Sequence, residues 1–394
     1  MAQAQAVRSP GPRVGAAAAW VWLAGVLTNA VAYLVPVFGA RQLSAGDLGA
    51  LATISAVAAI AGVPGLGLQI AVAVHRARHP GAPSGRVGWL TSAACATAVL
   101  ALTPVAGGLL DLPVATVPPL ALYTGAVVVA GRWLGEAQGD ERFARLALGM
   151  AILAAGRYGG LVAGLLLGAG LTGSVLAGTA TALLIPPALA LVTRSAPAPV
   201  EGGGGITARQ VVTACSATLA MLVVSYADLL LARHLLPAAS SGAYAVGTVL
   251  TKGAIWAPQV VTVIALPRLA RGSRRSLMVA LGLVAASGAV LVGASAVAGS
   301  LAFRLAGGAD YAGLGRYAPV FALTGALYAL VFVVVNAQVA AGARWPSAPL
   351  WTACAALVVA TEWLLPHTFT AVMWSAAATA AAALALSALA HRRG

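Results

Sequence analysis

Lys252 lies inside a long apolar stretch, where a charged side chain is expensive and points to a function. Trp256 and Gln259 follow it at spacings of four and seven residues, which place side chains on one face of a helix. Such a face suits a diphosphate that carries sugars, because the cation meets phosphate, the indole stacks on a sugar ring and the amide bonds hydroxyl groups. The alternative is a lysine that is paired structurally or extends its ammonium to a polar surface.

Arg157 is the second cation within an apolar stretch, and Tyr158 follows it directly. A guanidinium group can hold a phosphate through two parallel hydrogen bonds. We therefore predict a substrate-binding set made of Lys252, Trp256, Gln259 and Arg157. For Arg157 the alternative is an interhelical hydrogen bond to backbone or to a carboxylate.

Asp228 is a carboxylate near the end of a further apolar stretch, shortly before Arg233. It could couple transport to an ion or a proton, or form a gate salt bridge with Arg41 or Arg233. Arg41 and Arg233 occupy equivalent places in an internal repeat described below, which favours a gate rim. The alternatives are a local ion pair at a helix end for Asp228 and turn capping for the two arginines.

Residues for catalysis or metal binding do not assemble in this sequence. It has no paired carboxylates, no Ser/His/Asp set and no phosphate-loop motif, so we expect neither an enzyme nor a cofactor. His75 and His79 have a spacing of four residues but no third ligand, so no metal site is predicted. Any energy for transport would then come from an ion gradient, the substrate gradient or consumption of the product.

The composition places most of the chain in lipid. Of its 394 residues, 60% are hydrophobic and 8% are charged, with a mean hydropathy of +0.93. A soluble protein carries about 25% charged residues, so this chain cannot cover a globule with polar groups. The net charge of +14 is scattered between apolar runs, which fits membrane topology better than a nucleic-acid surface.

The apolar runs predict an all-α integral membrane protein, since a helix that spans a bilayer needs about 20 apolar residues. We expect twelve spans, at residues 16–40, 47–74, 87–108, 113–133, 146–168, 172–193, 208–232, 241–267, 277–303, 317–340, 347–366 and 369–390. Arginines are concentrated in every second loop, for example at Arg76, Arg78, Arg274 and Arg275. The positive-inside rule then puts both termini in the cytoplasm.

The two halves of the sequence repeat each other. Ala40-Arg41 and Ala232-Arg233 each precede a polar turn and Gly-Ala, and then a long apolar run with a proline, Pro64 or Pro258. Because each half has an even number of spans, both halves enter from the same side and are parallel repeats. The predicted domains are two six-helix bundles, 1–198 and 208–394, joined by a Gly/Pro-rich linker at 199–207.

Over roughly residues 16–345 the sequence resembles the Wzx-type polysaccharide and O-antigen flippases of the multidrug/oligosaccharidyl-lipid/polysaccharide exporter superfamily. The resemblance rests on the Ala-Arg turn, on Gly65–Gln69, and on the run from Asp228 through SGAYAVGTVLTKG to ALPRLAR. It implies a multi-pass protein of the bacterial inner membrane that flips a lipid-linked oligosaccharide for surface polysaccharide synthesis. Its partners would be this polyprenyl-diphosphate substrate, the bilayer and a coupling ion, proton or sodium, without nucleic acid.

Three other functions compete with this hypothesis. A drug or cation antiporter of the same superfamily would need acidic residues at mid-depth, which the sequence lacks. A membrane polymerase or ligase would need a large external loop with a catalytic base, and the external loop between Arg304 and Arg316 is too short. A non-transporting membrane scaffold would leave the repeat and the mid-depth cations unexplained.

Overall fold

The computed structural model describes residues 12–101, 103–104, 114–193, 205–307 and 309–393. All regular secondary structure in these residues is helical. Helices satisfy the backbone hydrogen bonds of an apolar chain within each segment, which is what a bilayer requires. The predicted fold class is confirmed: the chain is an all-α, multi-pass membrane protein.

The chain divides into two compact units, Met1–Val211 and Val212–Gly394, here called the N-terminal and C-terminal units. The helices of the N-terminal unit are α1 (Pro12–Gln42), α2 (Ala45–Arg78), α3 (Gly85–Ala101), η1 (Val114–Thr116), α5 (Val117–Gly139), α6 (Phe143–Leu166), α7 (Gly170–Leu183) and α8 (Ile185–Thr193). Those of the C-terminal unit are α9 (Ala208–Leu235), α10 (Ala238–Trp256), α11 (Gln259–Ala270), α12 (Arg274–Gly307), η2 (Ala309–Tyr317), α13 (Ala318–Ala341), α14 (Ala348–Val359), η3 (Ala360–Leu364) and α15 (Phe369–Arg393). Most of the expected linker lies outside the described residues.

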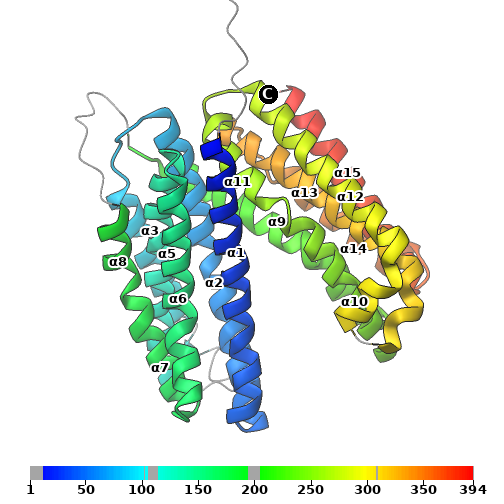
Figure 1. The fold of residues 1–394 in the computed structure, drawn as a ribbon, viewed down its shortest axis with the longest axis horizontal. Helices are drawn as coiled ribbons and strands as arrows, with labels where there is room; N and C mark the ends of the chain where they lie inside the picture. Colours follow the sequence, from blue (N-terminus) through cyan, green and yellow to red (C-terminus); the bar gives the residue numbers. More distant parts are fainter. Residues whose placement is uncertain (1–11, 102, 105–113, 194–204, 308, 394) are drawn as a thin grey trace, which may run out of the picture. The chain divides into compact units, whose positions relative to one another are not determined.

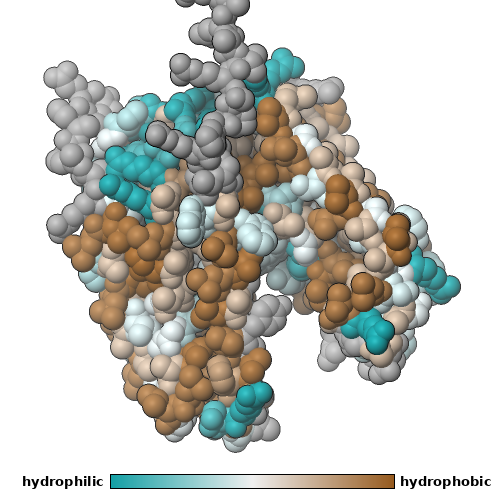
Figure 2. All heavy atoms as spheres, viewed as in Figure 1, coloured by the Kyte–Doolittle hydropathy of each residue, from teal (hydrophilic) through white to brown (hydrophobic). Residues whose placement is uncertain are grey.

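Within the described residues, ten helical segments are long and apolar enough to cross a membrane. The expected span 347–366 is apolar but shorter, at Ala348–Leu364, and its last turn is the π-helix η3. The expected span 87–108 corresponds to α3, and most of its remaining residues lie outside the described part of the chain. Figure 2 shows apolar side chains over the visible helix surfaces, with hydrophilic groups gathered mainly towards helix ends, as a lipid-embedded surface requires.

Each unit is built around one central helix. In the N-terminal unit α5 packs against α2, α3, α6, α7 and α8, and most of its residues are buried. In the C-terminal unit α13 packs against α10, α11, α12 and α15 and is buried to a similar extent. These are the fourth and tenth expected spans, so the repeat in the sequence corresponds to the same central position in each unit.

The expected span 241–267 is not one uninterrupted helix. It is divided into α10 and α11 at Ala257 and Pro258, whereas Pro64 lies within the continuous helix α2. Proline has no backbone N–H and its ring clashes with the preceding turn, so it can break a helix, as at Pro258. A membrane helix can also tolerate a proline, as at Pro64. The helix that carries Lys252 is therefore interrupted six residues further on, whereas the equivalent helix of the first repeat is continuous.

Candidate functional site

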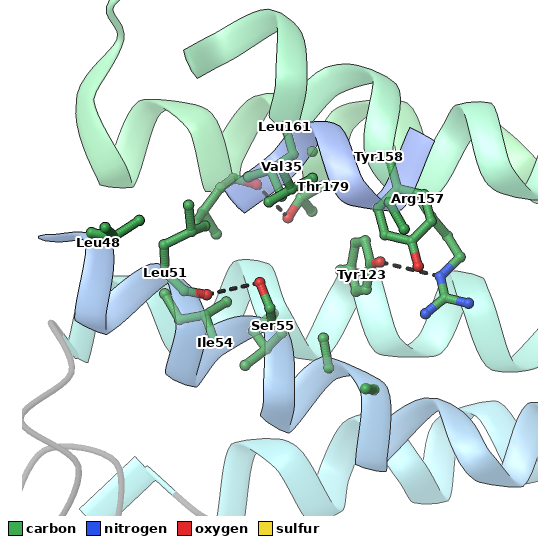
Figure 3. A pocket seen from close by; sticks show the side chains of 16 residues that line it. Val35, Leu48, Leu51, Ile54, Ser55, Tyr123, Arg157, Tyr158, Leu161 and Thr179 are labelled. Carbon is green, nitrogen blue, oxygen red and sulfur yellow. Dashed lines mark hydrogen bonds between the residues drawn. The ribbon is translucent and has the colours of Figure 1, made fainter. Parts of the chain in front are cut away.

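A cavity of about 300 Å³ lies within the N-terminal unit, between α1, α2, α5, α6 and α7 (Figure 3). Leu48, Leu51 and Ile54 of α2 line one end, where Figure 3 shows them apart from the aromatic residues. Tyr123 of α5 and Arg157 of α6 line the other end, together with Tyr158. The cavity therefore changes along its length from apolar to cationic and phenolic.

Arg157 is the charged residue of this cavity. Its Nε donates a hydrogen bond to the Tyr123 hydroxyl at 3.4 Å, and its guanidinium carbon lies 5.3 Å from the centre of the Tyr158 ring. No carboxylate lines the cavity, and none of the ion pairs between described residues includes Arg157. Its positive charge therefore has no acidic counterpart in the described part of the chain.

The serine and the threonine of the cavity direct their hydroxyl hydrogens to the backbone. Ser55 Oγ donates to the Leu51 carbonyl at 2.8 Å. Thr179 Oγ1 lies 3.0 Å from the Val175 carbonyl and 3.1 Å from that of Pro119. Ser55 bonds within α2, and Thr179 bonds within α7 and to α5, so Arg157 and the hydroxyls of Tyr123 and Tyr158 supply the donors available to a bound group.

Lys252 lies in α10 of the C-terminal unit and is half-buried. Its ammonium donates to the carbonyl oxygen of Ser225 and lies 3.1 Å from the Ser225 hydroxyl. The same ammonium lies 3.2 Å from the centre of the Tyr226 ring, a cation–π contact. Three groups of α9 thus hold Lys252, which is the arrangement expected of the structural alternative.

Asp228 lies one turn further along α9 and is 2% exposed. Its Oδ2 accepts a hydrogen bond from the Tyr244 hydroxyl of α10 at 3.1 Å. The Tyr328 hydroxyl of α13 is buried nearby and has no hydrogen-bond partner among the described residues. Asp228 makes no ion pair within the described residues, so its coupling role stays a prediction.

Trp256 and Gln259, the other predicted substrate-binding residues of the C-terminal unit, make no described contact with Lys252. Trp256 ends α10 and is 46% exposed, whereas Gln259 is an exposed residue that begins α11. Lys252 and Trp256 share α10 as expected, whereas the break at Pro258 interrupts the helical spacing between Lys252 and Gln259.

The gate role of Arg41 and Arg233 stays a prediction. Arg41 is exposed beside the last residue of α1, in the N-terminal unit. The side chain of Arg233 lies outside the described residues, although its backbone belongs to α9. A salt bridge of Asp228 with either arginine stays a prediction.

Sequence reasoning missed Tyr123, Ser225, Tyr226 and Tyr244. Tyr244 belongs to the motif SGAYAVG of the second repeat, and Tyr123 directly precedes Thr124-Gly125-Ala126, which recurs as Thr324-Gly325-Ala326 in the second half. Tyr123 and Tyr244 were therefore detectable as part of the repeat. Their pairing with Asp228 and Arg157 was not, because it joins residues of different helices.

The described residues contain no group of three or more His, Cys, Asp or Glu side chains that could hold a metal ion. The rings of His75 and His79 lie 4.8 Å apart in α2 and its C-terminal turn.

No family model matches the chain, and no curated protein matches it. Solved structures do. An outward-facing multidrug resistance MATE family transporter of the MOP superfamily is 13% identical, with a TM-score of 0.71 over 96% of this chain and 95% of that one. A Vibrio cholerae MATE transporter in the bent form is 15% identical, with a TM-score of 0.70 over 95% of each chain.

A third similar structure is a MOP superfamily transporter from Pyrococcus furiosus, described as having a binding pocket of reverse polarity that suggests a different function. It is 12% identical, with a TM-score of 0.68 over 95% of each chain. At these identities the likeness establishes the fold. The chain has the fold of the MATE transporters of the MOP superfamily, which are membrane transporters and not enzymes.

Proposed function

We propose that this protein is a membrane transporter that flips a lipid-linked oligosaccharide, attached to polyprenyl diphosphate, from the cytoplasmic to the outer leaflet. The observation that carries the proposal is Arg157, a cation in a cavity with no carboxylate along its walls. The MATE-type fold supports a transporter, and the charge of the cavity supports an anionic substrate.

The argument is electrostatic. An arginine at the centre of a membrane helix costs about 2.5–3.5 kcal/mol on insertion scales. The contacts that Arg157 makes with Tyr123 and Tyr158 are neutral and leave its charge uncompensated. A phosphate that enters the cavity supplies the missing anion, and a guanidinium can hold it with two parallel hydrogen bonds.

Residues of the C-terminal unit take a second part in this proposal. Lys252 is the other cation within an apolar stretch, and it would meet the diphosphate after leaving Ser225. Asp228 would carry the coupling proton or sodium ion, with Tyr244 as its present partner. The protein would act in the bacterial inner membrane with both termini in the cytoplasm.

A drug or cation antiporter is the second candidate, because one similar structure is a multidrug resistance transporter. A cationic drug would meet Arg157 with like charge in a cavity of low dielectric, where repulsion is strong. The same fold is found with a pocket of reverse polarity, so likeness of fold leaves the charge of the substrate open. The charge at Arg157 therefore favours the flippase.

The test is a flipping assay in proteoliposomes with a fluorescent lipid-linked oligosaccharide. Arg157→Gln should lower the flipping rate by about 10- to 100-fold, the equivalent of one lost charged hydrogen bond. Arg157→Lys should retain part of the rate, because it keeps the charge and loses the planar fork.

The matched control is Arg86→Gln, which removes an exposed arginine of the same unit and should leave the rate unchanged. Transport of a cationic dye by the wild-type protein, with no flipping of the oligosaccharide, would reject the proposal in favour of the antiporter.

A further inference from the structure

The N-terminal cavity has two chemically different ends. Arg157 and the Tyr123 hydroxyl form a head end that can hold one anionic group. Leu48, Leu51 and Ile54 form an apolar chain end, and the hydroxyl of Ser55 beside them donates to the Leu51 carbonyl. Leu161 and Val175 continue the apolar wall between the two ends.

This lining is unsuited to sugars. Each sugar hydroxyl that is removed from water needs a hydrogen-bond partner, and an unpaired one is costly. The hydroxyls of Ser55 and Thr179 already donate to backbone carbonyls, and beyond Tyr123, Arg157 and Tyr158 at the head end the remaining wall is aliphatic. An alkyl or prenyl segment meets no such penalty, because burial of apolar surface is favourable.

The size of the cavity points in the same direction. About 300 Å³ is at the lower limit of ligand sites, which run from roughly 300 to 1,000 Å³. It can hold a phosphate with a short length of chain, and it is too small for a whole lipid-linked oligosaccharide. The sugars of a substrate would have to lie outside it.

We infer that the N-terminal cavity binds the phosphate and the first apolar segment of a single-chain lipid phosphate, with the phosphate at Arg157 and Tyr123 and the chain along Leu48, Leu51 and Ile54. The inference rests on the proposed function, since it assigns one part of the proposed substrate to this cavity. The same chemistry occurs in a polyprenyl phosphate carrier and in a lysophospholipid of the membrane.

The experiment measures binding to the full-length protein in nanodiscs of uncharged lipid, with farnesyl diphosphate, farnesol, inorganic pyrophosphate and lysophosphatidic acid as probes. Farnesyl diphosphate should bind at least about tenfold more tightly than farnesol or pyrophosphate, because only it satisfies both ends. Tighter binding of farnesyl diphosphate than of lysophosphatidic acid identifies a prenyl carrier as the source. Equal binding identifies a lipid phosphate in general.

Two variants separate the ends of the cavity. Arg157→Gln should weaken the binding of farnesyl diphosphate by about tenfold and leave the binding of farnesol unchanged. Ser55→Phe places a ring in the middle of the cavity and should weaken the binding of both farnesyl diphosphate and farnesol. The matched controls are Arg86→Gln and Ile60→Phe, since Ile60 is 63% exposed on the same helix and does not line the cavity.

The outcomes distinguish the two proposals. Pyrophosphate binding as tight as that of farnesyl diphosphate, unaffected by Ser55→Phe, overturns the lipid-phosphate inference and leaves an anion site at Arg157. If Arg157→Gln leaves the binding of every phosphate probe unchanged, the inference is overturned and the proposed function loses its support. Melting temperatures like that of the wild type show that each variant is folded.

Discussion

At the scale of single residues, Lys252 and Asp228 are neighbours that are held separately. Lys252 is bound by Ser225 and Tyr226, and Asp228 is bound by Tyr244. The two charges are not within ion-pair distance, yet each lies in the field of the other. Removal of one charge should therefore alter the cost of burying the other.

We expect the effects of mutating Lys252 and Asp228 on the free energy of unfolding to be non-additive in a double-mutant cycle. Lys252→Met should lower the free energy of unfolding by about 1–3 kcal/mol, because it leaves polar groups of α9 without their donor and Asp228 without a nearby cation. Asp228→Asn should offset part of this loss, so the double variant should be less destabilised than the sum of the singles. Thermal unfolding of the purified protein measures all four members of the cycle.

Additive effects within about 0.5 kcal/mol would show that the two charges do not interact. Flipping by Lys252→Met at the wild-type rate would confine Lys252 to this structural role. Loss of flipping in Lys252→Met but not in Lys252→Arg, at equal protein levels, would instead assign its charge to transport.

At the scale of helices, the packing of α2 against α5 depends on glycine. A Cβ at Gly131 would lie 2.2 Å from the carbonyl oxygen of Gly65, which is backbone and cannot rotate away. The C-terminal unit has a similar close approach at a different position of its central helix, where a Cβ at Gly325 of α13 would lie 2.2 Å from the Thr251 carbonyl of α10. Small residues that let helix backbones approach are typical of membrane bundles.

Gly131→Ala should therefore destabilise the protein by about 1–3 kcal/mol, the usual cost of forcing extra volume into a packed interior. Gly159→Ala is the matched control, because a Cβ at Gly159 of α6 meets nothing within 4 Å. This control should be neutral or more stable by up to about 1 kcal/mol, since alanine favours a helix. Equal melting temperatures for Gly131→Ala and the wild type would contradict the close approach.

At the scale of the whole molecule, the parallel repeat predicts on which side of the membrane each loop lies. Pro83 precedes α3 and Ser273 precedes α12, so they hold equivalent positions in the two units. Gly313 lies in η2, between α12 and α13. With both termini in the cytoplasm, the first two positions face the cytoplasm and Gly313 faces outwards.

Cysteine labelling of intact cells tests this topology, after Cys95, Cys215 and Cys354 are replaced by alanine. A membrane-impermeant thiol reagent should label Gly313→Cys and should label Pro83→Cys and Ser273→Cys only after the cells are opened. Labelling of Ser273→Cys in intact cells, with Gly313→Cys protected, would reverse the orientation. Opposite exposure of Pro83→Cys and Ser273→Cys would exclude parallel repeats.

Composition and internal repetition are enough to predict the fold class, the approximate number of spans and the duplicated sequence pattern. Lipid leaves a long apolar chain few structural choices, and the helix is the one that satisfies its backbone locally. The repeated Thr-Gly-Ala at Thr124 and Thr324 even marked the helices that became the centres of both units. These properties follow from local composition and from comparison of one half of the chain with the other.

Which side chains meet depends on how the helices pack. Packing places Arg157 beside a cavity and the hydroxyl of Tyr123, and it places Lys252 against Ser225 and Tyr226 of α9. The helix also breaks at Pro258, although the equivalent Pro64 leaves α2 intact. Spacing along one helix reports which residues share a face, and the residues that face them come from other helices, so packing alone determines those contacts.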